Sequence, residues 1–474
     1  GYLKSDLDSE TRVETLITIS KAEINMGHFP EALDLLQESL KLSRQFSNPK
    51  ATIAALITQT IIHVSQGHWA KLNEVLTEAF KLANESGNLK EYGQALSIYA
   101  GFERMRGFQD SARSHYELAC QLLERAGDNR ELAIALNNLA DLEITQGNLS
   151  KGMHLLQQTL FHERTVGDPR NVAFVLTLMG RVSLLSGDLA KAEESFQAAF
   201  DLASPDGSRT PLRLYFVLCN MADLERKRGH LEEALQLAKE AISLLEKAEI
   251  SGIDLAYAWG MVTSLLLEMR KHPQAEEALT TTEILCSSLE FAEGIISNIL
   301  LRGTLELQKG NLGTAQDFLE KAREESEEKK FLEVQIQAEL ALANLFLQKL
   351  QLDPNKLVRE TAAAYLLRAS RLAAKTALDP WKLEAQIIEA VAHSLNFRYE
   401  EAMKILRYVE ATARSLELNL IEEKARKIKG PVRVQMRVLG VPTKLDEEML
   451  DYISHAQEYI TEAQSALRIP LERP

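Results

Sequence analysis

The sequence has 474 residues, a net charge of −14 and 6% aromatic residues, and it contains only 23 glycines and 12 prolines. This composition favours helices over a β-sandwich, and the acidic charge argues against nucleic acid or an anionic membrane as a general partner. No apolar run reaches the roughly 18 residues that a membrane span needs.

A helix–turn–helix pattern recurs along the chain from about residue 9, and most of its turns carry a glycine. Small residues lie seven positions before the glycine and five positions after it, as in Ala100 and Ala112 around Gly107. Small residues on both helices let the two backbones approach closely, so each unit is predicted to be an antiparallel helical hairpin. The first five turn glycines follow one another at intervals of 40 residues. The turn glycines are Gly27, Gly67, Gly107, Gly147, Gly187, Gly229 and Gly310.

Three further units have another residue in the place of the glycine. Arg270 occupies that place in the seventh unit, Leu350 in the ninth and Phe397 in the tenth. In the ninth unit an insertion near residues 350–358, which contains "LDPNK", delays the second helix. The pattern therefore predicts about ten hairpins over residues 1–418.

The C-terminal part departs from the repeat. Residues 419–443 are predicted to complete the last repeat and to form a connector that contains Gly430 and Pro431. Within it we expect "PVRVQMRVLGV" to be extended, because valines alternate there beside a proline. Residues 444–474 are predicted to form a capping helix and tail, with an apolar stripe that includes Met449 and Ile453.

The units resemble the tetratricopeptide repeat, whose standard length is about 34 residues. The extra residues lengthen the second helix, which is similar to kinesin light chains, to the cell-polarity adaptors that bind GoLoco peptides, and to the sensor arrays of maltose-activator-type regulatory ATPases. The stretches "ALNNLADLEITQG" and "LCNMADLERKRGHLEEALQLAKEAI" are especially similar to kinesin light chain units. The resemblance implies an all-α, right-handed α-solenoid that closes one superhelical turn in roughly seven or eight repeats.

In such an array the resemblance places the first helix of each hairpin on the concave surface. Polar residues recur there in the middle repeats, and an amide can pair with the backbone of a bound peptide. Asn138 and Asn220 match the position at which the related adaptors use asparagine for this purpose. An alternative is that these residues brace neighbouring repeats or are simply solvated. The candidate partner-binding residues are Arg104, Asn137, Asn138, Asp141, Thr177, Arg181, Asn220 and Asp223.

Two other recurring features suggest chemistry less directly. A glutamate lies four residues before several turns, as in Glu143 and Glu225, where it is expected to be solvated or ion-paired rather than to form an acidic ridge for a basic partner. Histidines follow the turn glycine without a metal-ligand spacing, so we expect no metal site.

No catalytic motif is present, so we expect a protein that is not an enzyme and that has no cofactor. With no signal peptide and three widely separated cysteines, a cytoplasmic location is predicted. The favoured hypothesis is a scaffold that binds a peptide or helix of a partner protein. The alternative is the sensor region of a larger regulatory ATPase or transcription regulator.

Overall fold

The computed structural model describes residues 9–66, 68–166, 169–203, 211–248, 250, 252–375 and 379–438. In these ranges the chain forms 21 α-helices and no β-strand, which confirms the predicted all-α class. The first ten helices are α1 (Ser9–Met26), α2 (Phe29–Gln45), α3 (Pro49–Ser65), α4 (Trp69–Ser86), α5 (Leu89–Met105), α6 (Gln109–Ala126), α7 (Asn129–Thr145), α8 (Leu149–Val166), α9 (Pro169–Leu185) and α10 (Leu189–Ala203). The others are α11 (Pro211–Lys227), α12 (Leu231–Lys247), α13 (Ile253–Glu268), α14 (His272–Ser288), α15 (Ala292–Lys309), α16 (Leu312–Lys329), α17 (Leu332–Leu352), α18 (Lys356–Lys375), α19 (Asp379–Leu395), α20 (Tyr399–Ser415) and α21 (Asn419–Val438).

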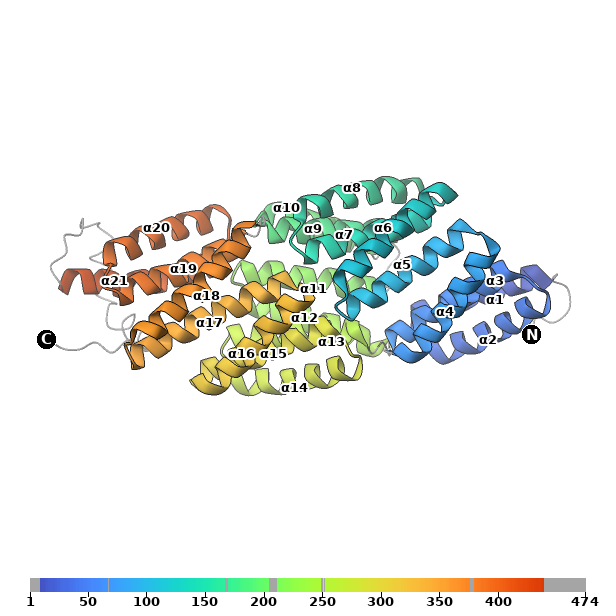
Figure 1. The fold of residues 1–474 in the computed structure, drawn as a ribbon. Helices are drawn as coiled ribbons and strands as arrows, with labels where there is room; N and C mark the ends of the chain where they lie inside the picture. Colours follow the sequence, from blue (N-terminus) through green and yellow to red (C-terminus); the bar gives the residue numbers. More distant parts are fainter. Residues whose placement is uncertain are drawn as a thin grey trace.

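Each odd-numbered helix from α1 to α19 packs against the next helix, which gives the ten predicted hairpins (Figure 1). The turn glycines within the described residues adopt the left-handed backbone conformation, with φ of 85° at Gly27 and 84° at Gly107. Arg270 and Phe397 adopt the same conformation, with φ of 55° and 58°, although it costs a residue with a side chain roughly 1 kcal/mol or more. The turn geometry is therefore kept at these two turns, whereas Leu350, in the glycine place of the ninth unit, lies inside α17.

The small residues of the repeat lie in the interior of each hairpin, as predicted. Ala100 and Ala112 are fully buried against each other's helices, and so are Ala222 and Ala234. At Gly152 an added Cβ would lie only 2.6 Å from Cγ1 of Ile144. The small side chains thus set the close approach of the two helices in a hairpin.

Two glycines of the eighth hairpin offer a test of this close packing. A Cβ at Gly303 would lie 2.8 Å from Cγ and Cδ2 of the buried Leu319, whereas a Cβ at Gly313 would meet no atom within 4 Å. We expect Gly303→Ala to lower the free energy of unfolding by about 1 kcal/mol despite the better helix propensity of alanine. The control Gly313→Ala should be neutral or stabilising by about 0.5 kcal/mol. Chemical denaturation of both variants measures the difference, and equal stabilities would contradict the packing argument.

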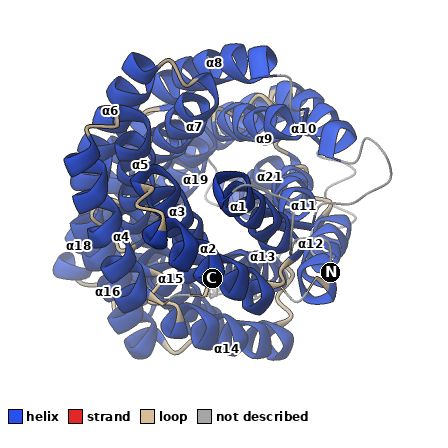
Figure 2. Ribbon diagram, turned by 90° about the vertical axis from the view of Figure 1, so that its right-hand side faces the viewer, coloured by secondary structure: helices blue, strands red, loops and turns tan. Residues whose placement is uncertain are grey.

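Successive superhelical turns of the array contact each other. Gly187 lies against Pro380 and Leu416, and Lys330 forms an ion pair with Asp110, 220 residues earlier in the chain. At 40 residues per repeat this separation corresponds to between five and six repeats per turn. The turn is therefore tighter than the seven or eight repeats expected. Viewed along the long axis of the molecule, the helices surround a common centre (Figure 2).

The prediction of an extended connector is wrong for residues 431–438, the part of that stretch that the structure describes. Helix α21 runs from Asn419 to Val438 straight through Gly430 and Pro431. It packs on α20 and buries Ile421, Ala425, Val432 and Met436. This burial offsets the cost of a proline inside a helix, which is about 3 kcal/mol. Helix α21 covers the end of the last hairpin, while the predicted cap at 444–474 lies outside the described residues.

The insertion near residues 350–358 lies mostly in a helix. Helix α17 continues to Leu352 and has 21 residues, compared with 18 in α15. A short loop follows, in which the side chain of Asn355 accepts a hydrogen bond of 2.9 Å from the backbone N–H of Val358. This contact caps the first turn of α18.

Candidate partner-binding surface

Three of the predicted residues form a charge ladder across consecutive repeats. The carboxylate of Asp141 on α7 pairs with Nη1 of Arg104 on α5 at 3.0 Å and with Nη1 of Arg181 on α9 at 3.1 Å. Between 20% and 27% of each side chain is exposed, so the ladder is accessible but largely desolvated. It joins repeats three, four and five on the face of their first helices.

Helices from the other side of the superhelix contribute charge to the same interior. Burial raises the pKa of Glu293 on α15, and the nearby guanidinium groups of Arg104 and Arg181 oppose this rise. Burial lowers the pKa of Arg181, but Tyr257 on α13 and the carboxylates of Asp141 and Glu333 more than offset it and raise the pKa overall. The ladder therefore faces acidic side chains of α15 and α17 across the interior of the superhelix.

A second charged group continues this surface in repeats six and seven. Nη2 of Arg226 pairs with Asp223 on the same helix at 2.6 Å, and its Nη1 reaches Glu268 on α13 at 2.8 Å. Burial raises the pKa of Asp223, but the charges of Arg226 and Lys227 outweigh it, so the pKa lies below its ordinary value. Asp223 is therefore ionised at neutral pH and held in an ion pair.

Three of the predicted residues are buried and do not form part of the exposed surface. Thr177 is fully buried, and its hydroxyl donates to the carbonyl of Ala173 at 2.8 Å. Asn220 is 4% exposed, and its Nδ2 donates to the carbonyl of Phe216 in its own helix at 2.8 Å. Asn137 is 6% exposed. The side chains of Thr177 and Asn220 are thus bonded to their own helices, whereas Oδ1 of Asn137 is buried and has no hydrogen-bond partner among the described residues. Asn138 remains partly exposed.

An apolar stripe beside the charge ladder was missed by the sequence reasoning. Ile134, Phe174, Phe216 and Tyr257 occupy the same position of four consecutive first helices, α7, α9, α11 and α13. Ile134 is 40% exposed, and Phe174 and Tyr257 are each 37% exposed. The rings of Phe174 and Phe216 stack with their centroids 5.0 Å apart. The stripe could have been recognised from the sequence, because these four residues recur with the spacing of the repeat.

The apolar stripe and the charged residues share one helix face. Ile134 and Phe174 precede Asp141 and Arg181 by seven residues, which is two helical turns or about 10 Å. Exposed large apolar groups next to charged side chains are a common feature of binding surfaces, whereas scattered single ones are not informative. Here they are aligned over four repeats.

The recurring glutamates accept hydrogen bonds from side chains in the turns of the hairpins. The carboxylate of Glu143 accepts from Nδ2 of Asn148 at 2.7 Å, and Glu306 accepts in the same way from Asn311 at 2.7 Å. In other repeats a histidine takes this place, as in the contact of 2.8 Å between Glu23 and His28. These glutamates are hydrogen-bonded within the repeat, so they do not form a free acidic ridge.

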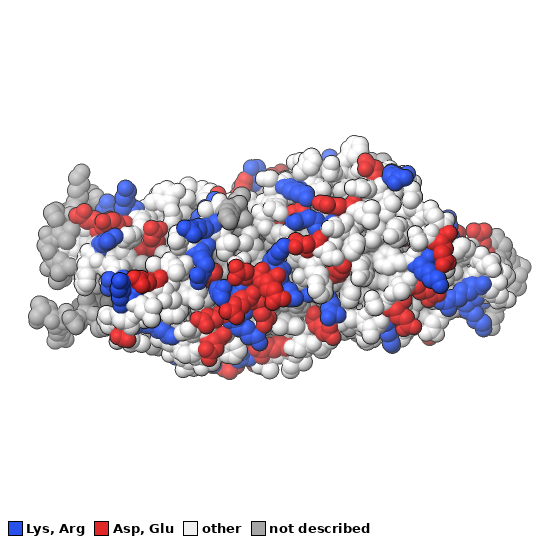
Figure 3. Space-filling model, in the orientation of Figure 1, with Lys and Arg blue, Asp and Glu red and all other residues white. Residues whose placement is uncertain are grey.

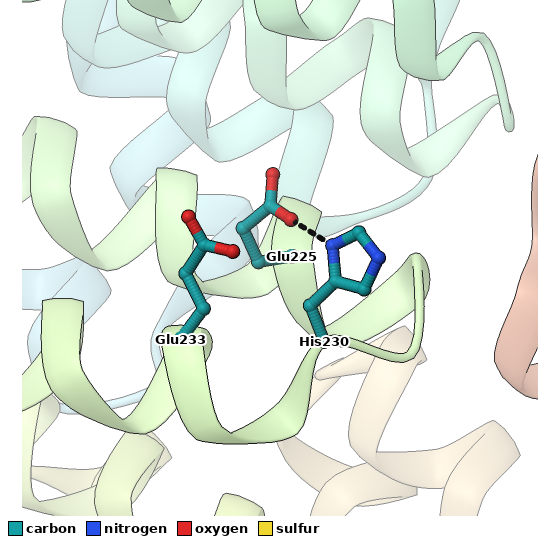
Figure 4. Close-up of side chains that lie close together, drawn as sticks. All are labelled: Glu225, His230 and Glu233. Atoms are coloured by element: carbon teal, nitrogen blue, oxygen red, sulfur yellow. Dashed lines mark hydrogen bonds and ion pairs between the residues drawn. The ribbon is translucent and has the colours of Figure 1, made fainter.

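One of these turns has the composition of a metal site. Glu225, His230 and Glu233 lie close together at the turn of repeat six, with Nδ1 of His230 2.7 Å from Glu225 (Figure 4). The Glu225–His230 contact is the same turn contact as in repeat one, and Arg228 already pairs with Glu225 at 3.0 Å. The arrangement is therefore explained by turn structure and charge pairing.

The outer surface carries an acidic region over α16 (Figure 3). Its glutamates are interleaved with basic side chains: Arg323 pairs with Glu324 at 2.9 Å and with Glu327 at 3.2 Å. Such exposed pairs contribute little to stability. Among the helices that the structure describes, none is long and apolar enough to cross a membrane.

The cysteines have no reactive character. Burial raises the pKa of Cys120 and of Cys219 to about 12 and that of Cys286 to about 11. All three thiols are free and stay protonated near neutral pH.

Two family descriptions match parts of the chain. The family described as the MalT-like TPR region matches residues 133–418, which is more than half of the chain. The family described as anaphase-promoting complex subunit 5 matches residues 21–106. No curated protein sequence matches this chain.

Solved structures share the fold at low sequence identity. The Rap conjugation gene regulator of the plasmid pLS20, in complex with the Phr* peptide, has a TM-score of 0.52 and 15% identity, over 77% of this chain and 95% of that one. A signal transduction ATPase with numerous domains and a tetratricopeptide repeat sensor, from Pyrococcus horikoshii, has a TM-score of 0.43 and 13% identity, over 83% of this chain and 57% of that one.

Proposed function

Because the chain belongs to the family of MalT-like tetratricopeptide repeat regions, we propose that it binds a peptide or helical segment of a partner protein on its concave face. The observation that carries this proposal is the apolar stripe Ile134–Phe174–Phe216–Tyr257, which runs parallel to charged residues of the same helices. No motif or side-chain cluster in the described residues supports catalysis, so we propose a binding role rather than an enzymatic one.

The spacing of the stripe suits an extended chain. Packed helices lie about 8–10 Å apart, and an extended peptide advances about 3.3 Å per residue. Every third residue of such a peptide would therefore contact the first helix of the next repeat. Apolar side chains of the peptide would contact Ile134, Phe174 and Tyr257. Acidic side chains of the peptide would pair with Arg104 and Arg181, and these pairs would fix the position of the peptide along the surface.

A second candidate is a sensor region within a larger regulatory ATPase or transcription regulator. The family match over residues 133–418 favours it, since that family is described as a region of MalT-like proteins. In this version the bound segment or effector would change the activity of a further domain. Both versions place the ligand on the same concave surface.

The stripe can be tested with peptides selected from a phage-displayed random library on the wild-type protein. We expect Ile134→Ser combined with Phe174→Ser to weaken binding of the selected peptides by about a hundredfold, because two apolar anchors contribute roughly 1–2 kcal/mol each. The variant should stay folded, since both side chains are more than one-third exposed, with a somewhat lower melting temperature because the stacking of Phe174 on Phe216 is lost.

A matched control is Phe161→Ser on α8, which removes an aromatic ring that is 70% exposed and lies on a second helix. This variant should bind the selected peptides like the wild type. Selected peptides that bind the double variant with unchanged affinity, or failure to select any peptide, would contradict the proposal.

A further inference from the structure

Large apolar side chains are exposed at the turns of the last two hairpins. Leu352 and Leu357 lie on either side of the turn between α17 and α18, and Phe397 lies in the turn between α19 and α20. Their exposed fractions of 71%, 73% and 78% are the three highest among the large apolar residues that the structure describes. Exposed apolar groups that gather at one edge indicate a contact surface, whereas single ones do not.

Phe397 is the least expected of the three. It takes the place of the turn glycine and adopts φ of 58°, a conformation that a residue with a side chain reaches only at an energetic cost. Its ring contacts Tyr399 of its own hairpin, with the centroids 6.2 Å apart, yet most of it faces water. In the third turn, by comparison, Lys329 of the next superhelical turn lies over the ring of Phe108 at 5.4 Å. No further superhelical turn follows repeat ten among the described residues, so Phe397 has no such cover.

The described part of the chain ends at the same edge of the array. The first helices pack side by side, since α17 contacts α19 and α19 contacts α21. Each first helix runs from the loop between repeats toward the hairpin turn, so the C-terminal ends of all three lie at one end of the molecule (Figure 1). Val438 is the last described residue, and residues 439–474 therefore continue from beside the exposed turns.

The outer face of α21 is unsuited to an apolar partner helix. Its exposed residues include Glu423, Arg426 and Lys427. They form ion pairs along the helix, with 2.9 Å between Glu423 and Lys427 and 2.6 Å between Arg426 and Glu422. A polar outer face of this kind is typical of the helix that closes a repeat array. An apolar segment that follows α21 is therefore expected to pack elsewhere.

We propose that residues 446–467 form an amphipathic helix that docks on the turns of repeats nine and ten. Leu352, Leu357 and Phe397 contact the apolar stripe of this helix and are removed from water. The surface is separate from the concave face proposed for the partner peptide. The stripe recurs at the spacing of one helix face and consists of Met449, Ile453, Ala456, Ile460, Ala463 and Leu467.

The length of the chain fits this place. Residues 439–445 span about 23 Å when extended, at about 3.3 Å per residue. Neighbouring packed helices lie about 8–10 Å apart, so α17 is about 20 Å from α21, within reach of this connector. As a helix, residues 446–467 are about 33 Å long, which is enough to cross both turns.

The contact can be tested in the full chain with the photoreactive amino acid p-benzoylphenylalanine at position 397, where it replaces another aromatic ring. After irradiation, mass spectrometry should find position 397 joined to residues 446–467, and the product should migrate as a monomer at every protein concentration. The control carries the same amino acid at position 284, because Ile284 is 65% exposed on α14, and should not join to this segment. A cross-linked dimer, a cross-link from position 397 to another region, or no cross-link above the control would overturn the proposal.

Hydrogen exchange provides a second measurement that needs no cross-linker. Amides of residues 446–467 should exchange at least about tenfold more slowly in the wild type than in Leu357→Ser combined with Phe397→Gly, because a single undocked helix is marginal in water. Glycine at position 397 suits the left-handed turn, so the array should stay folded, as far-ultraviolet circular dichroism can verify. The control Ile284→Ser should leave the exchange of the segment unchanged. Equal exchange in the wild type and the double variant would contradict the docking.

Discussion

Glu143→Ala is expected to lower the free energy of unfolding by about 3 kcal/mol. The Glu143 side chain is 1% exposed and joins three helices. It accepts from Arg113 on α6 at 2.9 Å, from Lys151 on α8 at 2.8 Å and from Asn148 in the turn between α7 and α8. Removal of a buried partner leaves the remaining charges without compensation, which usually costs about 3–5 kcal/mol. The lower end applies because Arg113 and Lys151 keep partial access to water.

Urea denaturation followed by circular dichroism measures this loss. Glu124→Ala is the matched control, because Glu124 is exposed on α6 and its side chain has no described partner. It should change stability by less than about 0.5 kcal/mol. A Glu143→Ala variant as stable as this control would contradict the assignment of Glu143 as a node that joins repeats three and four.

Ionisation of the Glu143 carboxylate should make the free energy of unfolding depend on pH. Burial raises the pKa of Glu143, but the bonds from Lys151 and Asn148 and the charge of Arg113 outweigh it, so the pKa lies below its ordinary value of 4.5. The ionised form therefore stabilises the fold above about pH 4.5, and this contribution is lost as the pH falls through the lowered pKa. Glu143→Gln should lose less stability than the wild type between pH 6 and pH 3, as melting curves at these pH values can measure.

The hairpin array could be predicted because its determinants are local. Small residues at two fixed distances from a turn, such as Ala140 before Gly147, specify the packing inside each hairpin. Where the glycine was replaced, as at Arg270 and Phe397, the spacing of the other positions still located the turn. The connector was mispredicted because Pro431 is a local signal for a break, and burial of Val432 and Met436 overrides it.

The candidate site could be predicted only in part, because side-chain exposure depends on small rotations of each helix. Arg104, Asp141 and Arg181 point to the interior of the superhelix, whereas Thr177, four residues before Arg181, is buried between helices. Contacts between superhelical turns depend on the small rotation between each repeat and the next, summed over about five repeats. The meeting of Lys227 and Trp381, which are far apart in sequence, therefore leaves no local pattern.

Charge reversal at Arg181 is expected to lower the stability of the fold, and a high salt concentration should restore part of this stability. In Arg181→Glu the new carboxylate lies beside Asp141 and faces Glu293 and Glu333, whose charges already act on position 181. We expect the free energy of unfolding to fall by about 3 kcal/mol at low ionic strength, because an ion pair is lost and like charges are brought together. Thermal melts with small-angle scattering would show lower stability and a larger radius of gyration.

The neutral variant Arg181→Met separates repulsion from the loss of the ion pair. It removes the contact with Asp141 but adds no negative charge, so it should cost about 1–2 kcal/mol and respond little to salt. For Arg181→Glu, a rise in ionic strength to about 1 M shortens the Debye length to about 3 Å, and part of the stability should return. Arg130→Glu, an exposed reversal on α7, should leave the melting temperature near that of the wild type. Equal stability of Arg181→Glu and Arg181→Met at every salt concentration would show that the carboxylates of α15 and α17 do not act on the ladder.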